Sequence, residues 1–200
     1  MKLLYSSASP YARKVRVVLA EKRIDCELVT VVPPYSLAQH NPLGKVPTLI
    51  LDDGSSLYDS RVIVDFLDNV SPISRLIPDD HRDRTAVRRW EALADGVLDA
   101  ALLVRQESQR TAITADGAAW IARQMEKIRE GLTAAEKDLA GHQWCHGERY
   151  TLADIALGSC LGYLNLRRPG GIDWATSTPG LVAHYARMLD RPTFAESSPE

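Results

Sequence analysis

The residues best suited to chemistry stand in a short polar stretch, Ser6-Ser7-Ala8-Ser9-Pro10, that follows an apolar start of the chain. Serine followed by proline is typical of a helix start, because serine can cap the helix and proline suits its first position. A ligand there would meet unpaired backbone N–H groups and the positive end of the helix dipole, which both favour an anion. Ser9 is therefore a candidate functional residue, with a plain helix cap as the alternative.

Two further motifs place ligand-binding groups at the ends of predicted elements. Pro47 follows Val46 at the start of a predicted strand, where a cis peptide bond would present the N–H and C=O of Val46 to an extended ligand. A trans proline opening an edge strand is the alternative. Asp59-Ser60 brings a carboxylate and a hydroxyl to a second predicted helix start, and these suit an α-ammonium and an α-carboxylate group respectively. Helix capping alone is again the alternative.

Two other groups of polar residues carry weaker signals. His142, Cys145 and His146 resemble part of a metal site, but a fourth ligand at suitable spacing is missing, so we expect no metal there and a structural role for Trp144. A basic patch follows Ser9, and such a patch is most often a solvated helix face, with attraction of anionic substrates as the alternative. It consists of Arg13, Lys14 and Arg16.

The elements that position these motifs are predicted in the order β-α-β, loop, β-β-α. The helix after Ser9 carries apolar residues on one face, and Asp52-Asp53-Gly54 supplies the turn of a hairpin. Such an order is thioredoxin-like. The predicted strands span residues 2–6, 26–32, 46–51 and 56–59, and the helices begin at Ser9 and Ser60.

The rest of the chain predicts an all-helical bundle. From Arg84 onward, apolar residues keep helical spacing through two long segments, and no convincing strand follows. Thr151-Leu152-Ala153-Asp154 predicts a capping box with Asp in place of Glu or Gln, and Thr178-Pro179 predicts a last helix. We expect a first domain over residues 1–76, a linker over 77–83 and a helical domain over 84–200.

Composition limits the classes of partner and compartment. The formal net charge of −2 over 200 residues gives no sustained field for nucleic acid or an anionic membrane surface. Because no apolar run reaches membrane-spanning length and the start of the chain turns polar early, we expect a cytoplasmic protein without a membrane span. The 3 cysteines are widely spaced and form no Cys-x-x-Cys motif, which argues against a disulfide framework and against an oxidoreductase that stores its own redox equivalents.

Taken together, the motifs resemble those of the glutathione transferases along most of the chain. The resemblance rests on Ser9-Pro10-Tyr11, on the loop Asn41-Pro42-Leu43-Gly44-Lys45-Val46-Pro47-Thr48-Leu49, on Asp59-Ser60-Arg61 and on Thr151-Leu152-Ala153-Asp154. Because Ser-Pro-aromatic opens the first helix, the chain resembles the serine-type cytosolic classes found in bacteria. The resemblance implies glutathione as co-substrate and a homodimer, in which the thioredoxin-like domain of one subunit faces the helical domain of the other.

By this resemblance Ser9 hydrogen-bonds the glutathione sulfur and is the expected catalytic residue. Val46 would pair through its backbone with the cysteinyl part of the tripeptide and Pro47 would be cis. Asp59 and Ser60 would hold the γ-glutamyl end, although Glu is commoner than Asp at the first of these positions. For two residues the resemblance is less specific. Lys45 would reach the glycyl or sulfur side of glutathione, and Tyr11 would line the electrophile pocket between the domains.

Several alternatives stay open. Other classes of the family use a Tyr near the end of the first strand, so Tyr5 competes with Ser9, as do Ser6 and Ser7; Tyr5 shares a strand face with Leu3, which favours core packing instead. The activated thiolate would serve conjugation of a small hydrophobic electrophile. It would serve equally in a glutathione-dependent isomerase, lyase, dehalogenase or peroxidase, and a non-catalytic binding or regulatory protein would retain the architecture alone.

Overall fold

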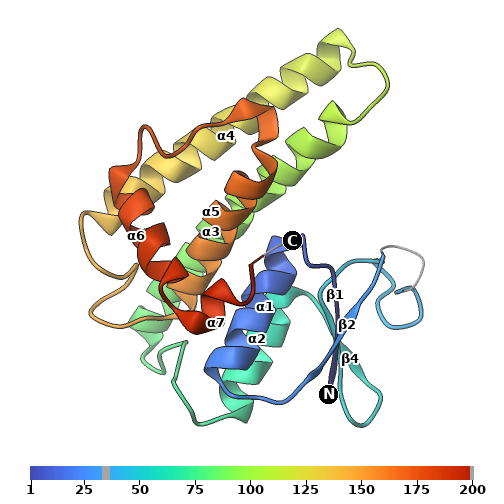
Figure 1. Cartoon of the computed structure of the whole chain (residues 1–200), viewed down its shortest axis with the longest axis vertical. Helices are drawn as coiled ribbons and strands as arrows, with labels where there is room; N and C mark the ends of the chain where they lie inside the picture. Colours follow the sequence, from blue (N-terminus) through green and yellow to red (C-terminus); the bar gives the residue numbers. More distant parts are fainter. Residues whose placement is uncertain (33–36, 199–200) are drawn as a thin grey trace.

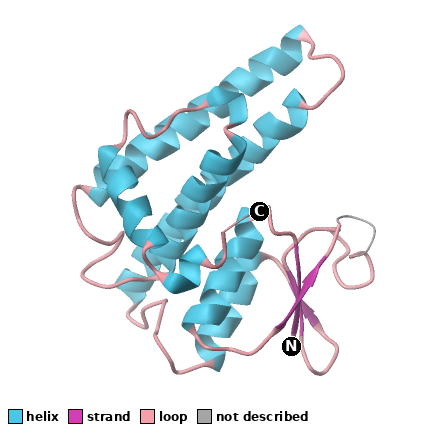
Figure 2. Ribbon diagram, viewed as in Figure 1, coloured by secondary structure: helices cyan, strands magenta, loops and turns pink. Residues whose placement is uncertain are grey.

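The computed structural model describes residues 1–32 and 37–198, which fold into a sheet-containing part and a helical part. All described strands lie before residue 58, and the rest of the described chain is helical with connecting loops. Figure 2 shows the strands gathered on one side of the molecule and the helices filling the remainder. The predicted class, a thioredoxin-like domain followed by a helical bundle, is confirmed.

A four-stranded mixed sheet forms the centre of the first part, with the order β2-β1-β3-β4. β1 pairs with β2 in parallel and with β3 antiparallel, and β3 pairs antiparallel with β4. The observed order along the chain is the predicted β-α-β-β-β-α, although the strands are shorter than predicted. The elements are β1 (Lys2–Tyr5), α1 (Pro10–Glu21), β2 (Glu27–Thr30), β3 (Thr48–Ile50), β4 (Ser56–Leu57) and α2 (Ser60–Val70).

The helical part contains two long helices and several shorter ones. In Figure 1, α3 and α4 extend side by side beyond the rest of the molecule, and α5 lies against α3. Thr178-Pro179 does open a helix, and a further short helix follows it. The elements are α3 (His81–Ser108), α4 (Ala115–Leu139), α5 (Leu152–Arg167), η1 (Pro169–Gly171), α6 (Pro179–Leu189) and α7 (Pro192–Ala195). The predicted domain limits, 1–76 and 84–200, stay a prediction.

Helices α1 and α2 lie on the same side of the sheet, between it and the helical part (Figure 1). One face of α1 packs on the sheet and α2, and the opposite face packs on α5. α5 is buried without a break from Leu152 to Leu164, as expected of a helix that is apolar all round. The junction of the two parts is therefore a continuous core and not a hinged contact.

A capping box at the start of α5 fixes this central helix. The Thr151 hydroxyl accepts from Ala153 N at 3.3 Å, and the Asp154 carboxylate accepts from Thr151 N at 2.8 Å. The same carboxylate accepts from Cys145 N at 2.8 Å, so it also holds the preceding loop. The capping box predicted from the sequence is confirmed, with Asp in the position usually taken by Glu or Gln.

The basic patch predicted on α1 is not a solvated face, and for two of its three residues the prediction is wrong. Lys14 is 1% exposed and its Nζ lies 2.8 Å from Glu91 Oε1 and 3.0 Å from Asp95 Oδ1. Arg13 is 2% exposed and donates to Phe194 O and Ser197 Oγ, each at 3.1 Å. Because α1 is covered on both faces, these cations lie in the interior and tie α1 to the helical part.

Candidate functional site

The topology gathers the sequence-predicted motifs at one end of the sheet. β1 and β3 run antiparallel with Leu4 opposite Thr48, so the end of β1 lies beside the start of β3. β4 runs antiparallel to β3, with Leu57 opposite Leu49, so β4 ends at that same end. Ser9 follows β1, Val46-Pro47 precedes β3 and Asp59-Ser60 follows β4. The three motifs therefore share one rim, next to the N-termini of α1 and α2.

Ser9 is the N-cap of α1, and its capping role leaves its own hydrogen available. The Ser9 hydroxyl oxygen accepts a hydrogen bond from Ala12 N at 3.2 Å. A hydroxyl has two acceptor lone pairs and one O–H donor, so accepting from the helix does not use the donor. The capping and catalytic interpretations of Ser9 are thus compatible, since the helix and a ligand anion would use different parts of one hydroxyl.

The segment before β3 presents backbone groups at this rim. The Val46-Pro47 peptide bond is cis, as the resemblance implied. Asn41 Nδ2 and the Thr48 hydroxyl both donate to the carbonyl of Lys45, at 2.9 and 3.0 Å, which fixes the loop just before Val46. In the described part of the chain, no hydrogen bond to the backbone of Val46 is formed, and the side chain of Lys45 is exposed. The backbone of Val46 is therefore free to pair with a ligand.

The start of α2 carries the second predicted motif and an additional cation. The carboxylate of Asp59 caps the helix by accepting from Arg61 N at 2.9 Å, and Ser60 is buried as the first helical residue. The guanidinium of Arg61 lies 3.2 Å from the buried carboxylate of Asp95 on α3. Asp95 is also held by Lys14, so this corner of the rim is anchored to the helical part.

Tyr11 and Tyr5 lie in different surroundings. The hydroxyl of Tyr11 donates a hydrogen bond to the carboxylate of Asp99 on α3, and burial together with this bond raises the pKa of the phenol far above its usual value. Tyr11 therefore lies between the domains. Tyr5 packs against the hydrophobic core, with Arg16 Cζ 5.0 Å from its ring centroid, as expected from its position on the same strand face as Leu3.

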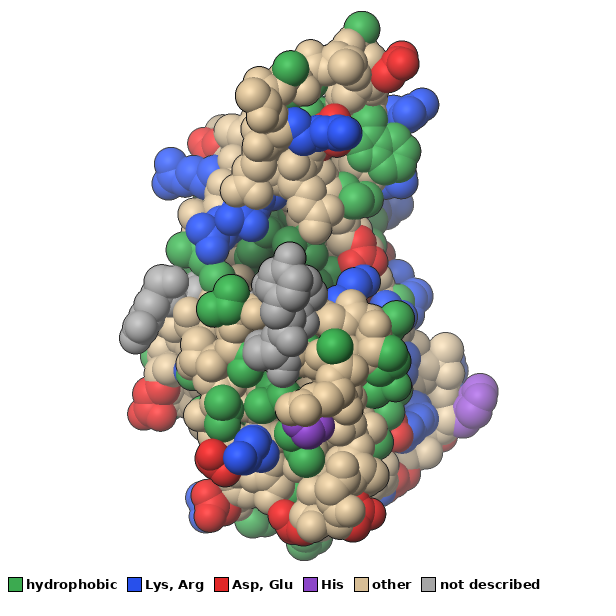
Figure 3. Space-filling model, turned by 90° about the vertical axis from the view of Figure 1, so that its right-hand side faces the viewer, with side chains coloured by type: hydrophobic (Ala, Val, Ile, Leu, Met, Phe, Trp, Pro, Cys, Tyr) green, Lys and Arg blue, Asp and Glu red, His purple; other side chains and the backbone are tan. Residues whose placement is uncertain are grey.

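A small cavity of about 10 Å³ lies directly beside Ser9 and includes two residues that sequence reasoning missed. Ser159 and Tyr163 reach it from α5, and the hydroxyl of neither has a hydrogen-bond partner in the described chain. In the sequence both belong to the long apolar run of α5, where nothing local separates them from core residues. On the face drawn in Figure 3, the surface is hollowed between the upper and lower parts of the molecule, and hydrophobic side chains lie in the hollow. The cavity is lined by Ser7, Ala8, Ser9, Pro10, Arg13, Ser159 and Tyr163.

Comparison with known proteins identifies the family. Models of the glutathione S-transferase N-terminal and C-terminal domains match residues 3–74 and 118–187. An uncharacterised GST-like protein of Escherichia coli strain K12, YibF, is 35% identical over 205 residues, covering 100% of this chain and 98% of that protein. The chain belongs to the glutathione S-transferase family.

Two further relatives bear on what a transferase of this kind binds and does. A glutathione S-transferase of Methylobacillus flagellatus KT, crystallised with glutathione bound, is 52% identical, with a TM-score of 0.93 and coverage of 100% of this chain and 99% of that one. The maleylacetoacetate isomerase of Mus musculus is 30% identical over 78% of this chain and 74% of that protein. None of the described helices of this family member is long and apolar enough to cross a membrane.

Of the three residues His142, Cys145 and His146, the structure places Cys145 in a buried group that includes neither of these two histidines. Cys145 lies beside His184 and Asp154, with distances of 3.7 Å from its sulfur to His184 Nε2 and 3.0 Å from that nitrogen to Asp154 Oδ1. His146 instead lies 3.2 Å from Asp83. The buried trio is held by hydrogen bonds to the capping box of α5, and burial raises the pKa of the Cys145 thiol. These contacts tie the loop before α5 and helix α6 to the start of α5.

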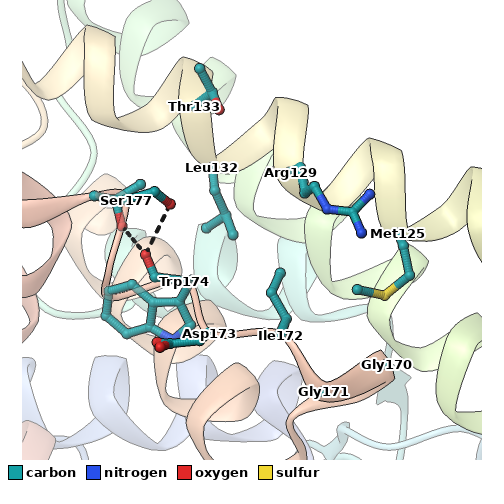
Figure 4. Close-up of a pocket in the computed structure, with 11 residues that line it drawn as sticks. Met125, Arg129, Leu132, Thr133, Gly170, Gly171, Ile172, Asp173, Trp174 and Ser177 are labelled. Atoms are coloured by element: carbon teal, nitrogen blue, oxygen red, sulfur yellow. Dashed lines mark hydrogen bonds between the residues drawn. The ribbon is translucent and has the colours of Figure 1, made fainter.

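A larger cavity, of about 420 Å³, lies far from these motifs, between α4 and the connection from η1 to α6 (Figure 4). The hydroxyls of Ser177 and Thr178 at its edge donate to the carbonyl of Trp174, at 3.5 and 2.7 Å. Arg129 pairs with Glu126 at 3.1 Å. Three of the polar side chains around this cavity are thus already engaged within the protein, in contrast to Ser159 and Tyr163 beside Ser9.

Proposed function

We propose that the chain is a glutathione transferase of the serine type, in which Ser9 stabilises the thiolate of glutathione for attack on a small hydrophobic electrophile. The observation that carries this proposal is the hydroxyl of Ser9, which caps α1 as an acceptor and keeps its O–H for a ligand at the rim shared with Val46 and Ser60. The family and the glutathione bound to the Methylobacillus relative support glutathione as co-substrate.

The other site residues would hold the tripeptide by complementary groups. The backbone of Val46, beside the cis bond to Pro47, would pair with the cysteinyl residue as an added strand does. Asp59 and Ser60 would hold the γ-glutamyl ammonium and carboxylate, and the adjacent Arg61 adds positive charge there. Two further residues complete the proposed site. The exposed Lys45 would lie at the glycyl or sulfur side, and Tyr11, which contacts Asp99 on α3, would lie at the electrophile pocket.

The energetics of the proposed chemistry are adequate. A free thiol with a pKa of about 8.5 is only a few per cent thiolate at neutral pH. A hydrogen bond to the charged sulfur contributes about 1.5–3 kcal/mol, and a helix N-terminus adds about 0.3–1 kcal/mol. Together these lower the thiol pKa by about one to three units, so that most of the bound glutathione is ionised near neutral pH. Ser9 acts as a donor and needs no partner base.

The decisive experiment compares Ser9→Ala with Ser7→Ala and Tyr5→Phe. We expect Ser9→Ala to lower kcat for 1-chloro-2,4-dinitrobenzene by about 100-fold, in line with removal of one donor to a developing or bound anion, while glutathione affinity falls less than about threefold. Ser7→Ala and Tyr5→Phe should keep most of the turnover. Full turnover in Ser9→Ala together with its loss in Tyr5→Phe would transfer the role to Tyr5.

A glutathione-dependent isomerase is the second candidate, favoured by the identity to maleylacetoacetate isomerase. The same thiolate would add to a cis double bond, allow rotation and leave again, so glutathione would not be consumed. Measuring glutathione consumption alongside cis-to-trans conversion of a maleyl-type ketone separates the two reactions. A thermal shift with millimolar glutathione tests the non-catalytic alternative. We also propose that the chain forms a homodimer, which light scattering would test, and that it is cytoplasmic.

A further inference from the structure

The cavity beside Ser9 is lined by hydroxyl groups that the fold leaves unused. Ser159 is 0% exposed and Tyr163 is 3% exposed, and neither side-chain oxygen has a hydrogen-bond partner in the part of the chain that the structure describes. A buried hydroxyl without a partner costs about 1–3 kcal/mol relative to one that is hydrogen-bonded. Two such hydroxyls on one turn of α5, facing the same small space as Ser9, point to a ligand atom that completes them.

The charge around this cavity is positive. Arg13 lines it, and its hydrogen bonds go to neutral oxygens of Phe194 and Ser197 and not to a carboxylate. Burial raises the pKa of Tyr163, while the positive charges of Arg105 and Arg167 act on it in the opposite direction. Neither of these two arginines forms an ion pair within residues 1–32 and 37–198.

The two more distant arginines have a structural role that the hydroxyls lack. Arg105 and Arg167 lie in the last turns of α3 and α5, where a cation complements the helix dipole. That role does not require Ser159 and Tyr163 to be polar, and alanine and phenylalanine would fill the same places in an apolar helix. The phenol of Tyr163 stays protonated at neutral pH, so both hydroxyls are available as donors to an oxygen atom.

We propose that Ser159, Tyr163 and Arg13 form an oxygen-binding notch that takes a carboxylate of the electrophile, which would make small unsaturated carboxylic acids substrates of the proposed transferase. The inference rests on the proposed function and specifies its substrate class. The cavity volume of about 10 Å³ matches one oxygen-sized group, so one carboxylate oxygen enters and the rest of the electrophile stays at the hollow between the domains.

Hydrogen bonds in the notch would also activate such acids, because the negative charge of a free carboxylate makes their β-carbon a poor electrophile. The glutathione thiol first loses its proton to solvent; the thiolate sulfur then forms a bond to the β-carbon, and the electron pair of the double bond moves through the α-carbon onto the carboxylate oxygens. A proton from water returns to the α-carbon, so the product is a thioether and no oxidant or reductant is needed. Donors at the oxygen stabilise the added charge where it develops.

The test compares two ligands that differ by one carboxylate, S-(2-carboxyethyl)glutathione and S-propylglutathione, with glutathione itself as the reference. In calorimetry on the full chain, we expect the carboxylate ligand to bind at least tenfold more tightly than the propyl ligand, as expected for hydrogen bonds to a charged group. In Tyr163→Phe this ratio should fall to threefold or less, and Ser159→Ala should lie between the two. Affinity for glutathione should stay within about twofold in each variant.

Tyr150→Phe is the control, because the Tyr150 hydroxyl is also buried without a hydrogen-bond partner in the described chain, while its ring packs against Arg191 and does not line the cavity. Its ligand ratio should equal that of the wild-type protein. Equal affinity for the two ligands in the wild type, or a ratio unchanged in both Tyr163→Phe and Ser159→Ala, would overturn the notch. Failure of glutathione to bind at all would instead remove the proposed function. If Tyr163→Phe does not fold, Ser159→Ala decides the matter alone.

Discussion

The start of α5 and the stretch of α5 from Ser159 to Tyr163 treat buried polar groups in opposite ways. At its start, the Asp154 carboxylate is 0% exposed and accepts from Thr151 N, Cys145 N and His184 Nε2, at 2.8, 2.8 and 3.0 Å. Further along the same helix, Ser159 and Tyr163 are also buried, but their hydroxyls have no partner among the described residues.

This difference distinguishes buried polar groups that stabilise the fold from those that are available to bind a ligand. A buried polar group with all its partners fixes the structure around it, whereas one without partners destabilises the fold and, where it lines a cavity, is available to a ligand. The satisfied carboxylate of Asp154 lies away from the rim that carries Ser9, and the unsatisfied hydroxyls line the cavity beside it. Substitutions at the start of α5 and in the stretch from Ser159 to Tyr163 should therefore change stability and ligand binding separately.

The largest effect is expected for Asp154→Ala. The change leaves three buried donors without an acceptor and removes the Asp154 half of the capping box, so we expect a loss of about 4–5 kcal/mol in the free energy of unfolding. Urea unfolding followed by circular dichroism measures it. The matched control is Asp138→Ala, which breaks a surface ion pair with Arg89 at 2.7 Å and should cost less than about 1 kcal/mol. Equal losses in the two variants would contradict the importance of the capping box.

The next largest effect is expected for Lys14→Met, which leaves the buried carboxylates of Glu91 and Asp95 without their shared cation. Removing one partner from a buried ion pair costs about 3 kcal/mol at neutral pH. The control is Lys2→Met, which breaks an exposed pair with Glu27 and should change stability little.

The loss in Lys14→Met should depend on pH in a definite direction. Burial raises the pKa of Asp95 above its usual value of 3.8, with the charge of Lys14 opposing this. In the pH range between the unfolded and folded pKa values, the folded state binds more protons, so stability falls as pH rises. Without Lys14 the folded pKa of Asp95 rises further, so the deficit should shrink as the pH is lowered from neutral. A deficit that grows on acidification would contradict the raised pKa of Asp95.

Local patterns were sufficient to predict the fold and the rim. The order of strands and helices, the capping of α1 by Ser9 and the box formed by Thr151 and Asp154 all depend on residues within a few positions of one another. The cis bond before Pro47 was implied by resemblance and is present. These features were accessible because capping, alternation and turn chemistry act over one or two turns of chain.

What the sequence missed depends on partners far apart in the chain. The interior position of Lys14 depends on Glu91 and Asp95, which are 77 and 81 residues away, so a lysine beside other basic residues was interpreted as a solvated face. Ser159 and Tyr163 stand in an apolar run, and only the packing of α5 against α1 brings them beside Ser9. No local rule distinguishes a hydroxyl that faces the core from one that faces a ligand.

A smaller effect is expected for Thr151→Ala at the satisfied end of α5. The Thr151 hydroxyl accepts from Ala153 N at 3.3 Å and lies 3.2 Å from Asp154 Oδ2, so its removal should lower the free energy of unfolding by about 1–2 kcal/mol, as for other helix caps. The control is Thr133→Ala on the exposed face of α4, which should change stability by less than about 0.5 kcal/mol. A loss no larger than that of Thr133→Ala would contradict the cap.

The smallest effect, and of opposite sign, is expected for Ser159→Ala in the middle of the same helix. Because the Ser159 hydroxyl has no partner in the described chain, its removal relieves a desolvation cost, and the ligand-free protein should unfold at the same or up to about 1 kcal/mol higher free energy. The two hydroxyl deletions in one buried helix should thus move stability in opposite directions in urea titrations. A loss of more than about 1 kcal/mol in Ser159→Ala would mean that the folded chain already satisfies this hydroxyl, which would remove the reason to assign it to a ligand.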